Sequence, residues 1–203
     1  AQGPLYNGKA IEKFIRLQCG PDGKIAFPLR MVYPAHATNS NGKTKYPAII
    51  KNEFTEQRFV KYGDIEYDNC PIEEELVTKR KYVLVTFNRS FLAPDKKDEK
   101  GPVHGLYPQY DWGTIAVWAW GHMRVTDYLY TLPIIDINKL CYTGHSRGGK
   151  TALCAGIYDE RAAIVVPNGS GCGGAGSFRF LGGHEGLQQN PEKCETVGRI
   201  CAA

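Results

Sequence analysis

The sequence lacks the features of a membrane protein or a nucleic-acid-binding protein. None of its apolar runs approaches the ~18 residues that a membrane-spanning helix needs, so we expect a soluble chain with no membrane partner. Neither sign of charge dominates: 25 basic against 21 acidic residues leave a net charge of +4, and basic residues cluster only at 79–81 and 96–97. A nucleic-acid-binding surface would be more concentrated. We therefore expect no nucleic-acid partner.

Internal repeats, low-complexity tracts and interdomain linkers are absent as well. The composition, with 42% hydrophobic and 11% aromatic residues, excludes a disordered chain and supplies the material for a hydrophobic core. We therefore expect residues 1–203 to belong to one domain.

Cysteine is plentiful, with seven residues, but no CxxC pair occurs, so the sequence gives little support for a zinc site. This many cysteines suggest an oxidising compartment and some disulfides. Because seven is odd, at least one thiol is free, paired with another chain, or paired with sequence not contained in these 203 residues. The chain begins Ala-Gln-Gly-Pro, without a methionine, which we interpret as a processed N-terminus compatible with secretion. We expect an extracellular protein.

Strands and helices are predicted to alternate along the chain. Apolar runs and alternating patterns predict strands at residues 24–35, 46–50, 82–87, 140–143 and 162–166. Helical periodicity and charge polarity predict helices at residues 72–80, 114–130 and 147–158, whereas residues 94–111 and the Gly-rich tail from 170 onward are interpreted as loops. This alternation indicates an α/β fold with a mostly parallel sheet flanked by helices. We expect Trp118 and Trp120 in its core.

One motif indicates chemistry. Gly144-His145-Ser146-Arg147-Gly148 matches G-x-S-x-G and lies between a predicted strand and a predicted helix, which is the context of a nucleophile elbow. Small residues two before and two after the serine allow a tight, strained turn that exposes the Ser146 hydroxyl. The N–H of Arg147, at the start of the helix, can then stabilise a tetrahedral oxyanion. The alternative interpretation is a structural Gly-rich turn or a site that has lost its activity.

Longer segments carry a family resemblance. GHSRGGKTALCAG at residues 144–156 and DERAAIVVPNGSGCGGAGSFR at residues 159–179, with DWG at 111–113, resemble the glucuronoyl esterases of carbohydrate esterase family 15, especially the bacterial type. The resemblance extends over about residues 25–200. It implies an α/β-hydrolase fold and cleavage of the ester between 4-O-methyl-glucuronic acid on xylan and lignin alcohols.

The resemblance also implies roles for individual residues. Ser146 is the nucleophile, Arg147 assists the oxyanion through its backbone and guanidinium, and Lys150 contacts sugar hydroxyls. The residue types agree with this, because two cations beside the nucleophile suit a uronic acid ring and developing negative charge. The alternative for Lys150 is a solvated helix residue. No metal and no organic cofactor is implied.

The sequence departs from the family at the other two positions of the catalytic triad. Fungal members have an acidic residue where this chain has Gly169, and the family's catalytic histidine belongs near the end of the fold, past residue 203. His184, the only histidine after Ser146, is expected to be a loop or substrate-rim residue, and His145 is expected to point to the other side of the elbow. We therefore expect the C-terminal strands of the fold, and the acid and base, to be missing from these residues.

Three interpretations of this incompleteness remain open. The chain is a fragment of a longer enzyme, a piece completed by a second chain, or a shortened relative that has lost catalysis and serves assembly, structure or binding. In the first two cases we expect a serine carboxylesterase acting on glucuronoxylan or lignin–carbohydrate esters by two-step acyl transfer. Another carboxylester hydrolase, such as an acetyl-xylan esterase, is the nearest enzymatic alternative.

Overall fold

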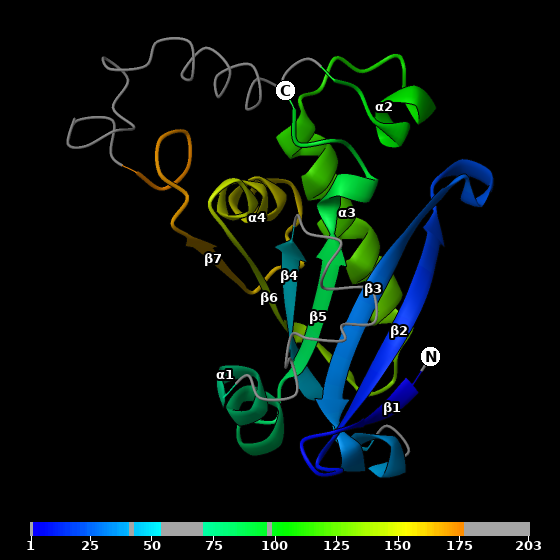
Figure 1. Cartoon of the computed structure of the whole chain (residues 1–203), viewed down its shortest axis with the longest axis vertical. Helices are drawn as coiled ribbons and strands as arrows, with labels where there is room; N and C mark the ends of the chain where they lie inside the picture. Colours follow the sequence, from blue (N-terminus) through cyan, green and yellow to red (C-terminus); the bar gives the residue numbers. More distant parts are fainter. Residues whose placement is uncertain (1, 41–42, 54–70, 97–98, 177–203) are drawn as a thin grey trace.

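The described residues form a seven-stranded sheet, with its strands in the order β1-β2-β3-β5-β4-β6-β7 (Figure 1). The computed structural model describes residues 2–40, 43–53, 71–96 and 99–176. The strands are β1 (Gln2–Leu5), β2 (Ala10–Cys19), β3 (Ile25–Pro34), β4 (Tyr46–Glu53), β5 (Val83–Asn88), β6 (Ile135–His145) and β7 (Ile164–Asn168). The helices are α1 (Pro71–Glu74), which continues as a π-helical turn (Glu75–Lys79), α2 (Pro102–Leu106), α3 (Thr114–Tyr130) and α4 (Arg147–Tyr158). Short 3₁₀ turns span Pro21–Gly23, Ala35–Ser40 and Arg89–Phe91.

The parallel part of the sheet positions the candidate site. β4 pairs in parallel with β5 on one side and β6 on the other, and β6 pairs in parallel with β7. β1, β2 and β3 extend the sheet by antiparallel pairing. Since parallel strands end at the same edge, the last residues of β4, β5, β6 and β7 lie along that edge although they are distant in the sequence. The predicted mostly parallel α/β sheet with flanking helices is confirmed.

The structure differs from the sequence prediction in three places. Residues 2–19, to which no element was assigned, form β1 and β2, and β2 pairs with β3 along its whole length. Most of the side chains of β2 are only half-buried, which explains why its apolar pattern is weak. The predicted loop at 94–111 contains the short helix α2. Strand β6 begins at Ile135, five residues before the predicted start. The apolar pattern did not predict these first residues, because most of them are polar and partly exposed.

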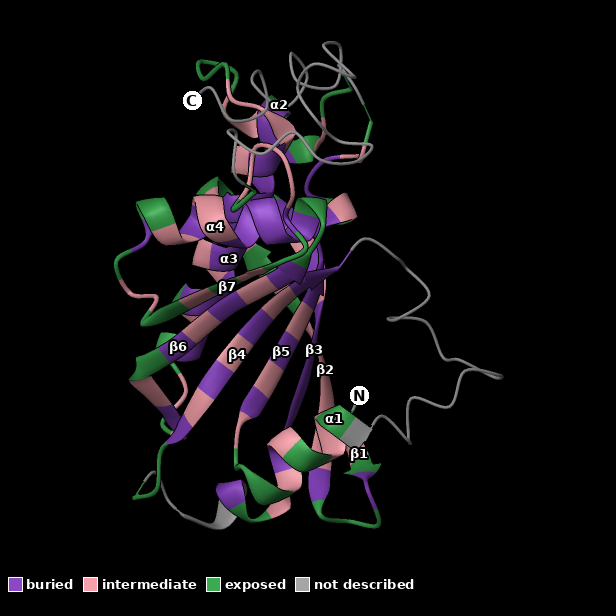
Figure 2. Cartoon of the chain, turned by 90° about the vertical axis from the view of Figure 1, so that its left-hand side faces the viewer, coloured by how far each residue is buried: buried purple, intermediate pink, exposed green. Residues whose placement is uncertain are grey.

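Each face of the sheet has its own hydrophobic cluster. Helices α3 and α4 pack together over one face, where the larger cluster contains Phe27, Val85 and Tyr142. The smaller cluster lies on the other face, where Val77 of the π-helical turn packs against Val32. Figure 2 shows buried residues recurring along the central strands beneath the helices. This recurrence is the two-residue period of a pleated sheet.

Both tryptophans of α3 belong to the core, as predicted. Trp118 is 1% exposed and Trp120 is 8% exposed. The indole N–H of Trp118 donates to the carbonyl of Ala93 at 2.9 Å, so its polar atom is satisfied inside the core.

A buried polar cluster joins strand β6 to the end of helix α4. The Tyr142 hydroxyl lies 2.6 Å from Thr126 Oγ1 and donates to Asp159 Oδ2 at 2.6 Å. Arg161 also donates to Asp159, from Nε at 2.7 Å. Burial alone would raise the pKa of Asp159, but the hydrogen bonds from Arg161 and Tyr142 outweigh it and lower this pKa. Asp159 is therefore a carboxylate at neutral pH, and its charge is satisfied by these donors.

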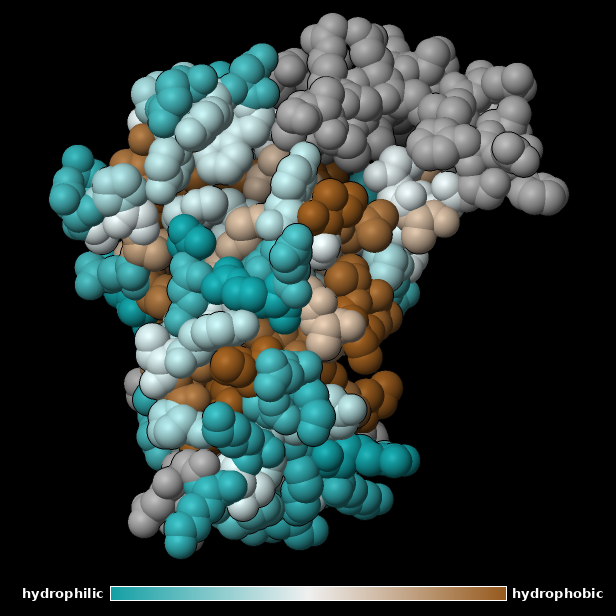
Figure 3. All heavy atoms as spheres, turned by 180° about the vertical axis from the view of Figure 1, so that it is seen from behind, coloured by the Kyte–Doolittle hydropathy of each residue, from teal (hydrophilic) through white to brown (hydrophobic). Residues whose placement is uncertain are grey.

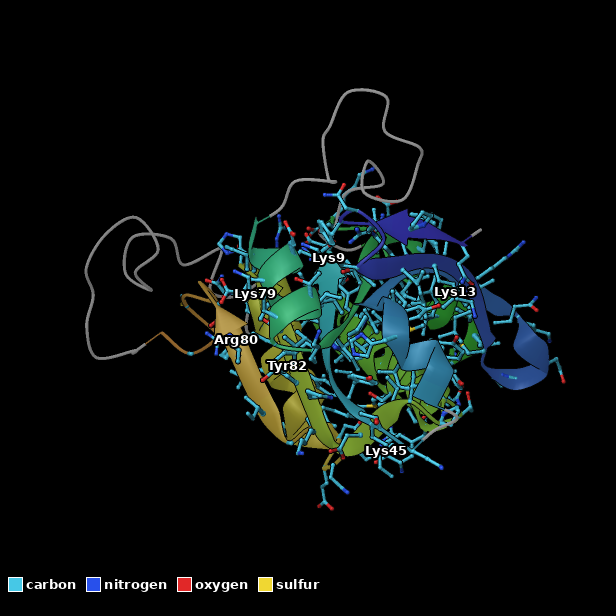
Figure 4. All side chains as sticks on the ribbon, turned by 90° about the horizontal axis from the view of Figure 1, so that it is seen from below. Lys9, Lys13, Lys45, Lys79, Arg80 and Tyr82 are labelled. Atoms are coloured by element: carbon cyan, nitrogen blue, oxygen red, sulfur yellow. The ribbon has the colours of Figure 1, made fainter. Side chains whose placement is uncertain are left out.

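The structure also bears on the sequence expectations about membrane-spanning helices, basic clusters and disulfides. Among the described residues, no helix has the length and apolarity to cross a membrane. Of the basic side chains labelled in Figure 4, Lys79 and Arg80 lie next to each other, whereas Lys13 and Lys45 lie at other places around this view from below. Within the described part of the chain no disulfide is formed, and Cys19 and Cys141 carry free thiols. The disulfides and the secretion expected from the sequence therefore stay predictions.

Substituting Tyr142 tests the buried cluster. Tyr142→Phe should lower the free energy of unfolding by about 1.5–3 kcal/mol, because it removes a hydrogen bond to a buried carboxylate. Urea unfolding of the chain measures this difference. Tyr158→Phe is the matched control, because Tyr158 is 58% exposed at the end of α4 and should change stability by less than about 0.5 kcal/mol. Equal effects of the two variants would contradict the role given to Tyr142.

Candidate functional site

Ser146 occupies the turn between strand β6 and helix α4. Its backbone angles, φ 57° and ψ −120°, lie in a region that residues with a side chain rarely adopt. Such a conformation costs about 1–3 kcal/mol and persists only where surrounding contacts impose it. The Ser146 N–H donates to the Asn168 carbonyl at 3.0 Å, and the Ser146 carbonyl accepts from Gly149 N and Lys150 N at 2.9 and 3.1 Å. The turn is therefore held by β7 on one side and by the first turn of α4 on the other.

Two glycines make this turn possible. A Cβ on Gly144 would lie 2.4 Å from the Gly148 carbonyl oxygen, and a Cβ on Gly148 would lie 2.6 Å from Asn52 Oδ1. Real Cβ atoms do not approach other atoms so closely, so both positions require glycine. This close packing is the geometry expected of a nucleophile elbow. The glycine spacing in the sequence predicted it.

Asn52, the next-to-last residue of β4, supports the turn from below. It is completely buried, and its Nδ2 donates to the carbonyls of Gly148 at 2.9 Å and Thr143 at 3.3 Å. These carbonyls lie on opposite sides of Ser146 in the sequence, so one side chain ties the end of β6 to the start of α4. Oδ1 of Asn52 accepts from Nη1 of Arg89 at 3.0 Å. Sequence reasoning missed Asn52, because no local motif surrounds it.

His122 of helix α3 is a further buried partner of Asn52. Its Nε2 lies 2.8 Å from Nδ2 of Asn52, and the ring is fully buried against Phe87 and Tyr142. Burial lowers the pKa of His122 to about 3, so the imidazole is neutral at physiological pH. A neutral Nε2 accepts the hydrogen bond from Asn52. His122 thus acts through Asn52 on the turn and does not contact Ser146.

The Arg147 side chain is directed to the β5 side of the site. Its Nη1 lies 2.6 Å from Oδ1 of Asp95, in the segment between β5 and α2, and the side chain is 56% exposed. Asp95 Oδ2 in turn lies 3.7 Å from Nη2 of Arg89, which is 3% exposed. Burial lowers the pKa of Arg89 to about 10, and Asp95 and Glu53 oppose this effect. Arg89 therefore remains a cation at neutral pH.

Lys150 is not the solvated helix residue that the alternative interpretation required. It is 8% exposed, and its ammonium group donates to the carbonyl of Ser170, just beyond β7. Lys150 thus joins helix α4 to the turn after β7, one turn of helix from Ser146. Its contact with a sugar stays a prediction.

The catalytic histidine expected after Ser146 is not among the described residues. His145 is exposed, and its ring lies beside Gly169: a Cβ there would be 3.0 Å from His145 Cε1. Of the other histidines that the structure describes, His36 packs edge-on against Tyr46 and His104 accepts from the N–H of Gly101. None of them hydrogen-bonds Ser146. His184 lies outside the described residues.

Gly169 has φ +53°, a conformation that favours glycine. A side chain at this position would carry backbone strain, and its Cβ would lie in tight contact with the ring of His145.

The arrangement can present a nucleophile to an electrophilic carbonyl. Ser146 is exposed at the carboxyl edge of the sheet, at the top of the parallel strands in Figure 1. The N–H groups of Arg147 and Gly148 precede those that bind the Ser146 carbonyl, and they can face an anion at the start of α4. The Arg147 guanidinium adds a positive charge there. Among the described residues no group of three or more His, Cys, Asp or Glu side chains is placed to hold a metal ion.

Comparison with known proteins identifies relatives of this arrangement. A family model described as glucuronyl esterase of fungi matches residues 21–201. The 4-O-methyl-glucuronoyl methylesterase of Hypocrea jecorina (strain QM6a) is 31% identical over 173 residues, which are 82% of this chain and 32% of that protein. The carbohydrate esterase MZ0003 of an unknown prokaryotic organism is 48% identical over 84 residues, 41% of this chain and 18% of that protein.

A solved structure agrees with these sequence matches. A promiscuous CE15 esterase from a marine bacterial metagenome superposes with a TM-score of 0.71 and 26% identity, over 99% of this chain and 58% of that chain. The chain therefore spans somewhat more than half of this structure, and about a third or less of the two curated relatives.

The glycine requirement of the elbow can be tested by adding one methyl group. Gly148→Ala should lower the free energy of unfolding by about 1–3 kcal/mol, because the new Cβ meets the buried side chains of Asn52 and Arg89. Gly105→Ala in α2 is the matched control, since its Cβ would meet nothing within 4 Å and its stability should be unchanged or up to about 1 kcal/mol higher. Thermal or urea unfolding distinguishes the two. A Gly148→Ala variant as stable as the unsubstituted chain would show that the turn is looser than described.

Proposed function

Because the chain belongs to the glucuronyl esterase family, we propose that the protein hydrolyses 4-O-methyl-glucuronoyl esters with Ser146 as the nucleophile. The observation that carries this proposal is the strained Ser146 turn at the start of α4, with the cationic side chains of Arg147 and Lys150 in the same helical turn. The substrate class follows that of the Hypocrea jecorina relative, which is named for this ester. Glucuronoxylan and lignin–carbohydrate esters are the natural substrates we propose.

The mechanism is a two-step acyl transfer. Ser146 Oγ attacks the ester carbonyl and gives its proton to a general base, and the carbonyl oxygen becomes an oxyanion. The backbone N–H of Arg147 and its guanidinium stabilise that charge. The alcohol leaves after protonation, and water then releases the uronic acid from Ser146 and regenerates the hydroxyl. Lys150 supports binding of the sugar at the base of the site.

We propose that the general base and its acidic partner come from a further C-terminal segment or a second chain that completes the fold. Among the described strands β7 lies at the edge of the sheet, and its Ile164 and Val166 are 60% and 47% exposed. Beside them an open groove of about 700 Å³ is lined by further apolar residues, including Ile49, Ile72 and Cys141. Figure 3 shows hydrophobic side chains gathered along the flank that carries β7. Additional strands paired with β7 would bury this surface.

An extracellular location fits the proposed substrates. Glucuronoxylan and its lignin esters are insoluble plant polymers, so an enzyme that attacks them acts where they are deposited. The cysteine-rich composition is compatible with an oxidising compartment.

Substituting the nucleophile tests the activity. In the full-length natural protein, Ser146→Ala should reduce hydrolysis of benzyl glucuronate to the background rate, because no other group on the turn can form the acyl intermediate. Release of benzyl alcohol measures the reaction, and Tyr158→Phe on the exposed end of α4 is the control that should keep full activity. An inactive natural protein of 22.6 kDa would instead favour the alternative of a catalytically lapsed binding or assembly protein.

Lys150 tests the substrate assignment. Lys150→Ala should raise KM for benzyl glucuronate severalfold and leave turnover of an acetyl ester nearly unchanged, because the uronate ester carries sugar hydroxyls on its acyl group and an acetyl group has none. Steady-state kinetics on both substrates, with unfolding curves to confirm that the variant is folded, give the answer. Equal losses on the two substrates would favour a general carboxylesterase such as an acetyl-xylan esterase.

A further inference from the structure

We propose that Asp95 is a positioning residue for the reaction: it holds the Arg147 guanidinium at the β5 side of the Ser146 turn, and the buried Arg89 anchors it there. This inference rests on the proposed function, in which Arg147 stabilises the oxyanion. Asp95 lies in the sequence segment that was interpreted as a loop, 51 positions before the nucleophile, and no motif marks it.

The carboxylate of Asp95 lies between two guanidinium groups. Its Oδ1 is 2.6 Å from Nη1 of Arg147, and its Oδ2 is 3.7 Å from Nη2 of Arg89. The three side chains differ in exposure, at 56% for Arg147, 21% for Asp95 and 3% for Arg89. The contacts therefore run from the exposed site into the core, with Asp95 in the middle.

Arg89 is a fixed anchor because it is held on several sides. Its guanidinium lies 4.6 Å from the centroid of the Trp118 ring, which is itself buried. Its Nη1 donates to Oδ1 of Asn52 at 3.0 Å, and Asn52 donates to the Gly148 carbonyl at 2.9 Å. The same guanidinium is thus connected to the backbone of the Ser146 turn through Asn52 and to the Arg147 side chain through Asp95. Arg89 therefore helps to position both the Ser146 turn and the Arg147 guanidinium.

Charge explains why Asp95 is needed between them. Arg89 and Arg147 are close enough for Arg147 to lower the pKa of Arg89, while Asp95 opposes that effect. If the carboxylate becomes neutral, the buried cation faces a half-exposed cation with no anion between them. The Arg147 side chain can relieve the repulsion by turning into solvent, away from the carbonyl under attack. A donor that must be recovered from solvent during the reaction stabilises the transition state less than one already in place.

An exposed ion pair by itself contributes little, commonly less than about 1 kcal/mol. The Asp95–Arg147 pair differs because one member is fixed by a buried cation, so its geometry is set before substrate arrives. Asp95 therefore acts on the orientation of the Arg147 side chain and not on the stability of the fold.

Kinetics of the full-length natural protein provide the test. Asp95→Asn should lower kcat for benzyl glucuronate roughly tenfold with a smaller change in KM, and Arg147→Ala should lower kcat by ~10²-fold, as for the loss of one oxyanion donor. In the Arg147→Ala background, Asp95→Asn should cause no further loss, because its effect acts through Arg147. Asp95→Glu, which keeps the charge, should recover part of the activity. Multiplicative losses in the double variant would overturn the proposal.

A matched control and a second readout separate this inference from the proposed function. Glu99→Gln removes a carboxylate from the same segment, but Glu99 pairs at 3.2 Å with the exposed Lys96, so activity should be unchanged.

Side-chain ¹⁵N NMR should show guanidinium signals of Arg147 with restricted rotation, identified by their absence in Arg147→Ala. These signals should collapse in Asp95→Asn. If the natural protein lacks esterase activity, the proposed function fails while this measurement still decides the role of Asp95. Unchanged Arg147 signals in Asp95→Asn would overturn the positioning role of Asp95.

Discussion

The hydrogen bonds from the Asn52 amide to the carbonyls of Thr143 and Gly148 hold the rest of the site in place. They connect the end of β6 to the start of α4 across Ser146, whose backbone conformation is unfavourable by itself. A strained turn persists only when its neighbours leave it no better alternative. Here the neighbours are a fully buried amide below the turn and, at its two flanks, glycines that admit no side chain. The exposure of the Ser146 hydroxyl is a consequence of these contacts.

Burying the Arg89 cation beside that amide costs free energy of desolvation, yet the buried guanidinium organises the site. Arg89 loses almost all of its hydration, and burial lowers its pKa, but the Trp118 ring, Asn52 and Asp95 surround it with favourable partners. Removing one partner of a buried charge destabilises a fold, so these contacts limit where the Arg89 side chain can lie. The network links β4, β5, α3 and α4, so packing of the core and geometry of the site depend on the same side chains.

The carboxyl edge of the parallel strands and the lateral flank of the sheet at β7 differ in polarity. The carboxyl edge gathers the nucleophile and its polar supports, whereas the flank at β7 is apolar and half-exposed. The chain superposes over 99% of its length on a CE15 esterase and covers 58% of that chain. The glucuronyl esterase family and the α/β-hydrolase fold follow from independent observations, the matching family model and the superposition. The serine chemistry and its substrate rest on the proposal above.

The sequence by itself determined the features that depend on neighbouring residues. The spacing of Gly144, Ser146 and Gly148 predicted the elbow because its steric limits act within five residues, and apolar periodicity predicted α3, α4 and the central strands because burial of one face imposes it. It did not predict strand β2, whose side chains are mostly half-buried, or the burial of Lys150. Only the tertiary structure decided that Asn52, Arg89, Asp95 and His122 surround the turn. Their contacts depend on the strand order β5-β4-β6, which brings together residues from separate elements and leaves no periodic or local pattern in the sequence.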